Sequence, residues 1–111
     1  MGYAKERGAQ RIPFACELEC TGAGEDPLNP RISDLSATGA FIDSMNAIPA
    51  GTRMTLRFVL PTGPVTVVAE VVHAMPHFGM GVRFLNLTDE QRRGIERLVA
   101  DVSSVGASEG H

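Results

Sequence analysis

Aromatic residues and lysine are scarce in this sequence. It has no tryptophan and one tyrosine, Lys5 is its single lysine, and its net charge is −3 at pH 7. Proteins that bind single-stranded nucleic acids use aromatic platforms in basic grooves, and DNA binders neutralise many phosphates with cations. We therefore expect no DNA or RNA partner, which also argues against a small RNA-binding barrel.

Long apolar runs are missing too. No stretch approaches the roughly 20 apolar residues that span a bilayer, and the N-terminus lacks the charged and then apolar pattern of a signal peptide. We expect a cytoplasmic protein with no membrane partner. The length of 111 residues suits one compact domain.

Cysteine occurs only at Cys16 and Cys20. On a strand over residues 12–20 they would share a face roughly 13 Å apart, too far for a disulfide. We read them as two buried thiols, since no second cysteine pair completes a zinc site. His73 and His77 have a helical metal-ligand spacing, but Pro76 excludes a helix there. We expect no metal site.

Alternating apolar residues predict a mainly β chain. The predicted strands cover residues 12–20, 31–35, 39–44, 53–60, 65–71 and 78–84. A helix of about 14 residues follows Thr88, which forms a capping-box pattern with Gln91. Because open sheet edges promote aggregation, a small antiparallel barrel capped by the helix is the favoured arrangement.

The same patterns divide the chain into three parts. Residues 1–11 are predicted to form a flexible arm, because they follow neither apolar period. Residues 12–102 form the barrel with its helix. Residues 103–111 are small and polar, and we expect a disordered tail.

Two motifs stand out: Arg7-Gly-Ala-Gln-Arg11 in the arm, and Asp34-Leu-Ser36-Ala-Thr-Gly39 between two strands. The sequence resembles the PilZ family, whose signature is RxxxR in an N-terminal arm followed by DxSxxG on the barrel. The segment Gly79-Met-Gly-Val-Arg-Phe84 before the terminal helix extends the resemblance to almost the whole chain. It implies a six-stranded antiparallel PilZ-type β-barrel that binds cyclic di-GMP, a bacterial second messenger.

The residue chemistry agrees with this ligand. Arg7 and Arg11 suit guanine O6/N7 acceptors and phosphates, while the carboxylate of Asp34 suits the N1/N2 donors. Ser36 offers a hydroxyl to a guanine or phosphate, and Gly39 permits the turn or a close ligand approach. Whether Arg83 reaches the ligand stays open.

We find no catalytic constellation, so we expect no enzyme and no cofactor. The leading hypothesis is a cyclic di-GMP receptor or adaptor, a monomer or weak homodimer, whose arm becomes ordered on binding and presents a surface to an unidentified downstream protein. The alternative is a PilZ-fold protein-interaction module that does not bind nucleotide.

Overall fold

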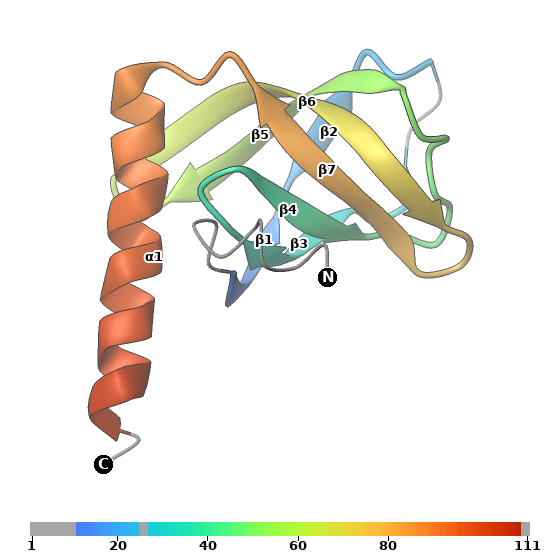
Figure 1. The fold of residues 1–111 in the computed structure, drawn as a ribbon. Coiled ribbons are helices and arrows are strands. Elements are labelled where there is room, and N and C mark those ends of the chain that lie inside the picture. Colours follow the sequence, from blue (N-terminus) through green and yellow to red (C-terminus); the bar gives the residue numbers. More distant parts are fainter. Residues whose placement is uncertain (1–10, 25–26, 110–111) are drawn as a thin grey trace, which may run out of the picture.

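Seven strands and one helix make up the described chain. The computed structural model describes residues 11–24 and 27–109. In chain order the elements are β1 (Ile12–Glu17), β2 (Glu19–Thr21), β3 (Arg31–Leu35), β4 (Gly39–Asp43), β5 (Arg53–Leu60), β6 (Gly63–Met75), β7 (Gly79–Leu85) and α1 (Asp89–Glu109) (Figure 1). Within these residues no helix is both long enough and apolar enough to cross a membrane.

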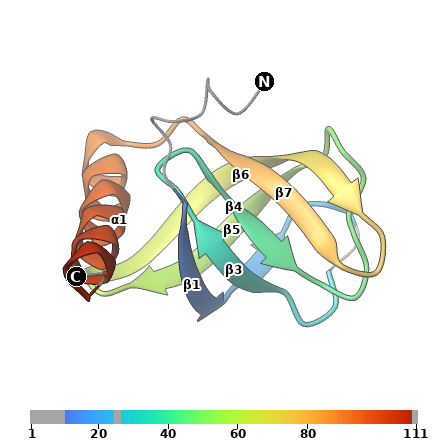
Figure 2. The same ribbon diagram turned by 60° about the horizontal axis from the view of Figure 1, so that its bottom comes forward.

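The strands form one antiparallel sheet with the order β1-β3-β4-β7-β6-β5-β2. β1 and β2 are consecutive in the chain but lie at opposite ends of this order. The sheet therefore curls into a half-barrel, with α1 beside it (Figure 2). The predicted antiparallel β-barrel fold with a C-terminal helix is confirmed, although it has seven strands and not six.

The additional strand arises where the predicted strand over residues 12–20 changes partner. β1 pairs with β3, whereas β2 pairs with β5. Ile12, Leu18 and Cys20 are all buried, so the apolar alternation continues through the break between the two strands. A two-residue period shows which face is buried but not which strand lies alongside, and this is why the sequence predicted one strand.

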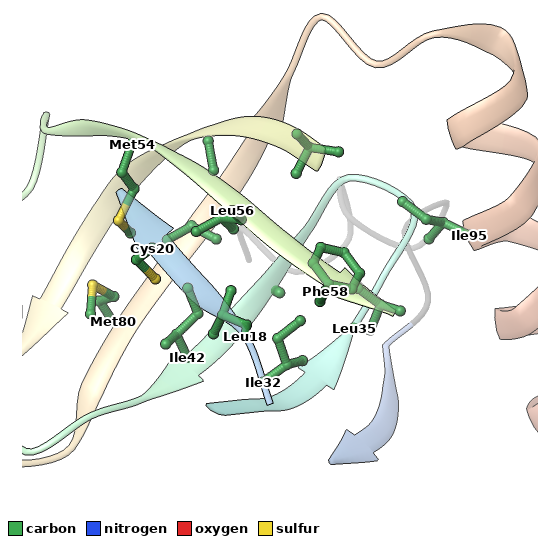
Figure 3. Packing of buried hydrophobic residues seen from close by; sticks show 14 of the residues in the cluster. Leu18, Cys20, Ile32, Leu35, Ile42, Met54, Leu56, Phe58, Met80 and Ile95 are labelled. Atoms are coloured by element: carbon green, nitrogen blue, oxygen red, sulfur yellow. The ribbon is translucent and has the colours of Figure 1, made fainter. Parts of the chain in front are cut away.

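The core fills the concave face of the sheet. Figure 3 shows side chains from β2, β3, β4, β5, β7 and α1 meeting there, together with Leu18 between β1 and β2: Leu18, Cys20, Ile32, Leu35, Ile42, Met54, Leu56, Phe58, Met80 and Ile95. Burying one large apolar side chain contributes about 1.5–3 kcal/mol, so this cluster holds the curled sheet together. The two cysteines form no disulfide with each other, and Cys16 is only partly buried, which corrects the prediction of two buried thiols.

The helix begins as predicted and ends later. The Thr88 hydroxyl accepts the N–H of Gln91 at 3.0 Å, and the Gln91 side chain accepts the N–H of Thr88 at 3.1 Å. Buried Ile95 and Val99 face the sheet. The helix has 21 residues in place of about 14, because residues 103–109 continue it where we predicted a disordered tail. That stretch contains no proline, so backbone chemistry does not force a stop.

Candidate ligand site at the β3–β4 turn

The turn between β3 and β4 is built around a buried serine. The Ser36 hydroxyl accepts the backbone N–H groups of Thr38 at 3.2 Å and Gly39 at 3.1 Å. Its oxygen also lies 3.2 Å from the Gly39 carbonyl oxygen and 3.3 Å from the Thr38 hydroxyl, either of which can accept its proton. These bonds satisfy the fully buried side chain and define the shape of the turn.

Gly39 is a glycine because β7 passes close to it. Gly39 pairs with Arg83 on β7. A Cβ at Gly39 would overlap the Val82 carbonyl oxygen and lie 3.1 Å from the Arg83 Cα. The sequence suggested a turn or a ligand approach as the reason for this glycine, and the structure supplies a third one, the close packing of two strands.

Arg11 and Asp34 come together although they are 23 positions apart in the chain. The Arg11 Nη2 and Nε atoms lie 2.6 Å and 2.9 Å from Asp34 Oδ1. The strand that follows Arg11 brings it there, because Pro13 of β1 pairs with Asp34 of β3. Both side chains remain partly exposed, at 49% for Arg11 and 35% for Asp34. One residue from each predicted motif therefore contributes to an ion pair at the surface. Arg7 of the first motif lies outside the described residues.

A second ion pair lies next to the turn. Arg83 of β7 pairs with Gly39 on one side and with Glu70 of β6 on the other. Its Nη2 and Nε atoms lie 2.8 Å and 3.2 Å from Glu70 Oε1. Arg83 is 61% exposed, so its guanidinium is accessible from solvent while it is held beside the turn.

The local charge follows from these two pairs. Arg11 is balanced by Asp34 and Arg83 by Glu70, so the described part of this surface has no excess charge. Guanidinium donors and carboxylate acceptors nevertheless stand side by side, which is the arrangement that suits a ligand with both acceptor and donor edges.

Thr38 is a turn residue that the sequence reasoning did not select. Its carbonyl oxygen accepts the N–H of Phe84 at 2.8 Å, and this bond ties the turn to the end of β7. Its position between the serine and glycine of the second motif is the signal that could have identified it. No group of three or more His, Cys, Asp or Glu residues in the described ranges is placed to hold a metal ion.

Two solved structures have folds similar to that of this chain. The PilZ domain with c-di-GMP of YcgR from Escherichia coli superimposes with a TM-score of 0.70 at 17% sequence identity, covering 94% of this chain and 96% of that chain. The PilZ domain of CeSA from a cellulose-synthesizing bacterium gives a TM-score of 0.63 at 23% identity, covering 85% and 98%. A comparison with curated proteins found no match.

The family assignment rests on the sequence as a whole. The family model of the PilZ domain matches residues 5–101, which include both motifs, the curled sheet and most of the helix. The order of the motifs, their meeting at the β3–β4 turn and this match agree with one another. This chain belongs to the PilZ domain family.

Proposed function

We propose that this protein is a cyclic di-GMP receptor that acts as an adaptor, without catalysis of its own. The observation that carries the proposal is the contact between Arg11 and Asp34, in which residues from two separate motifs converge at 2.6 Å on an exposed turn. The fold is also that of the PilZ domain with c-di-GMP of YcgR.

The ligand chemistry matches the two side chains. Cyclic di-GMP has two phosphodiester charges, guanine O6/N7 acceptors on one edge, and N1/N2 donors on the opposite edge. In the proposed complex the Asp34 carboxylate accepts from the donor edge, and Arg11 donates to the acceptor edge or a phosphate. Ser36 acts mainly by shaping the turn, because a direct bond to the ligand requires its hydroxyl to give up a bond within the turn.

Ligand binding is then an exchange of partners. A partly exposed ion pair such as Arg11–Asp34 stabilises a protein by only about 0–1 kcal/mol. Micromolar binding corresponds to about −8 kcal/mol, so breaking this pair takes a small share of the binding free energy. The ligand supplies new partners for both the guanidinium and the carboxylate, which leaves neither one unpaired.

The dianionic ligand needs positive charge beyond that of the described residues at the β3–β4 turn. Arg11 and Arg83 are already balanced by carboxylates, so Arg7 of the first motif is the residue we assign to the remaining phosphate or guanine contacts. In this proposal residues 1–11 close over the ligand, and the ordered arm presents a new surface to a partner protein.

One observation favours the alternative, a PilZ-fold interaction module that does not bind nucleotide. The Ser36 hydroxyl, the Asp34 carboxylate and the Arg83 guanidinium each have a protein partner, so this surface is stable as it stands. The two functions differ in one property, which is whether the chain binds the nucleotide.

Isothermal titration calorimetry with the full chain and cyclic di-GMP distinguishes them. We expect saturable binding that is lost in Arg7→Ala, Arg11→Ala and Asp34→Ala, with folding retained by circular dichroism. Arg57→Ala is the matched control, since Arg57 is an exposed arginine on β5 without an ion pair to a described residue. Absence of heat at both low and moderate salt would favour the interaction module, and normal binding by the three variants would place the site elsewhere.

A further inference from the structure

A groove of about 580 Å³ runs between the β5–β6 turn and the first half of α1. Figure 1 and Figure 2 both show this turn lying alongside the helix. Pro64 and Val65 contribute apolar surface to the groove, which the buried Leu60 also lines, and Arg93 and Arg97 line it from the helix. None of these residues belongs to the β3–β4 turn or to the two ion pairs beside it.

Gly94 keeps this groove open. It lies on the helix between Arg93 and Arg97 and lines the groove. A Cβ at Gly94 would lie 3.7 Å from both Leu60 Cδ1 and Thr62 Oγ1, which is ordinary contact, and its φ is not in the left-handed region. Packing therefore does not require a glycine here, although glycine destabilises a helix interior relative to alanine. What the glycine provides is a groove wall without a side chain.

The charge of the groove is positive. Arg93 and Arg97 are four positions apart, so their side chains leave the same face of α1. Neither forms an ion pair with a described carboxylate, whereas Arg92 of the same helix pairs with Asp89 at 3.7 Å. Glu90 is the single acidic residue of the lining. Two unpaired guanidiniums are thus concentrated at one hollow on a chain whose net charge is −3.

We propose that this groove docks an acidic segment of a partner protein, with an apolar side chain against Pro64 and Val65 and carboxylates on Arg93 and Arg97. The charge complementarity selects the acidic partner, because guanidinium–carboxylate bonds are charge-assisted and can be bidentate. The exposed residues Thr62 and Thr66 line the same hollow, and their hydroxyls can bond the peptide backbone. The inference does not depend on nucleotide binding, because it uses none of the motif residues.

The test uses the full ¹⁵N-labelled chain and synthetic peptides as probes. The acidic probe alternates Glu or Asp with Leu, and the charge-reversed probe has Lys in place of each acidic residue. With the acidic peptide we expect saturable shifts of the Thr62, Gly94 and Arg97 amides in NMR spectra. The charge-reversed peptide and inorganic phosphate alone should leave these amides in place.

Variants locate the contact. Arg93→Gln and Arg97→Gln should each weaken the acidic peptide roughly tenfold, the loss expected for one charge-assisted contact. Gly94→Leu should fill the groove and abolish binding, while circular dichroism verifies that the helix is intact. Arg92→Gln is the control, since Arg92 lies on the same helix, does not line the groove and should bind as the unchanged chain does.

Four results would overturn the proposal. The groove amides do not shift at the highest concentration of acidic peptide, or Arg97→Gln binds that peptide as tightly as the unchanged chain does. Alternatively, the charge-reversed peptide or inorganic phosphate binds as tightly as the acidic peptide. A concentration-dependent dimer that Gly94→Leu abolishes would also contradict it, because the occupant would then be a second copy of this chain. Loss of cyclic di-GMP binding in Arg11→Ala has no bearing on these outcomes, so the two proposals fail separately.

Discussion

Among the described residues, the arginines beside the β3–β4 turn are paired with carboxylates, whereas those of the groove beside α1 are not. Arg11 and Arg83 are each held by a carboxylate at 2.6 Å and 2.8 Å, whereas Arg93 and Arg97 form no ion pair with a described residue. A paired arginine must exchange its partner to bind a ligand, which favours a ligand that replaces both members of the pair. An unpaired arginine can add a partner directly, which favours docking by charge alone.

The two regions also differ in how their glycines act. A side chain at Gly39 would collide with the backbone of β7, while a side chain at Gly94 would make only ordinary contacts. Close packing of β4 against β7 therefore requires a glycine at position 39, whereas packing does not require one at position 94. The predictions below test this difference, from the largest expected effect to the smallest.

Gly39→Ala should be the most damaging substitution. The new Cβ would overlap the Val82 carbonyl oxygen, so β4 and β7 must move apart. We expect the free energy of unfolding to fall by more than about 2 kcal/mol, the range of overpacked cores. Urea denaturation measures it, and an unchanged midpoint would show that the two strands are not tightly packed at this position.

Ser36→Ala should cost about 1–3 kcal/mol, the usual penalty for unsatisfied buried groups. The substitution removes the acceptor of the Thr38 and Gly39 N–H groups at the turn. Ser33→Ala is the matched control, because the Ser33 hydroxyl makes only a long bond of 3.4 Å to the Phe41 carbonyl oxygen. Equal unfolding midpoints for the two variants would contradict the assigned role of Ser36.

Gly94→Ala should change stability in the opposite direction. Alanine fits at 3.7 Å from its neighbours and favours the helix by up to about 1 kcal/mol relative to glycine. We expect a higher thermal midpoint than that of the unchanged chain. A lower midpoint would mean that packing does require the glycine and would remove one support for the docking groove.

Arg11→Ala should lower stability by less than about 1 kcal/mol, and less still in high salt, because it removes a partly exposed ion pair. Arg97→Ala should show no comparable loss, since Arg97 has no described carboxylate partner. Urea denaturation at two salt concentrations compares them. An equal loss of stability in both variants would contradict the distinction between paired and unpaired arginines.

The sequence predicted the parts of the fold that depend on periodicity. Alternation located the strands, and the Thr88–Gln91 capping box located the start of α1. It did not predict the change of partner at Leu18, because β1 and β2 bury the same face and the pattern continues through the break. The length of α1 was missed for a related reason, since small polar residues suit both a frayed tail and a continuing helix.

The site was predicted unevenly. The two motifs pointed to Arg11 and Asp34, and the structure brings these side chains together. The burial of Ser36 and the strand contact at Gly39 depend on where β7 passes, which local sequence does not reveal. Arg93, Gly94 and Arg97 resemble an ordinary exposed helix surface in the sequence, so only the packing of the β5–β6 turn against α1 reveals a groove.

The most direct test of the central claim is an NMR titration of the ¹⁵N-labelled chain with cyclic di-GMP, following the Arg11 Nε–H and the backbone amides. The account predicts that the signals of Arg11, Asp34 and Ser36 shift in a saturable way as the ion pair opens, while those of Thr62 and Gly94 in the groove keep their positions. Unchanged signals at the β3–β4 turn under saturating nucleotide would contradict it.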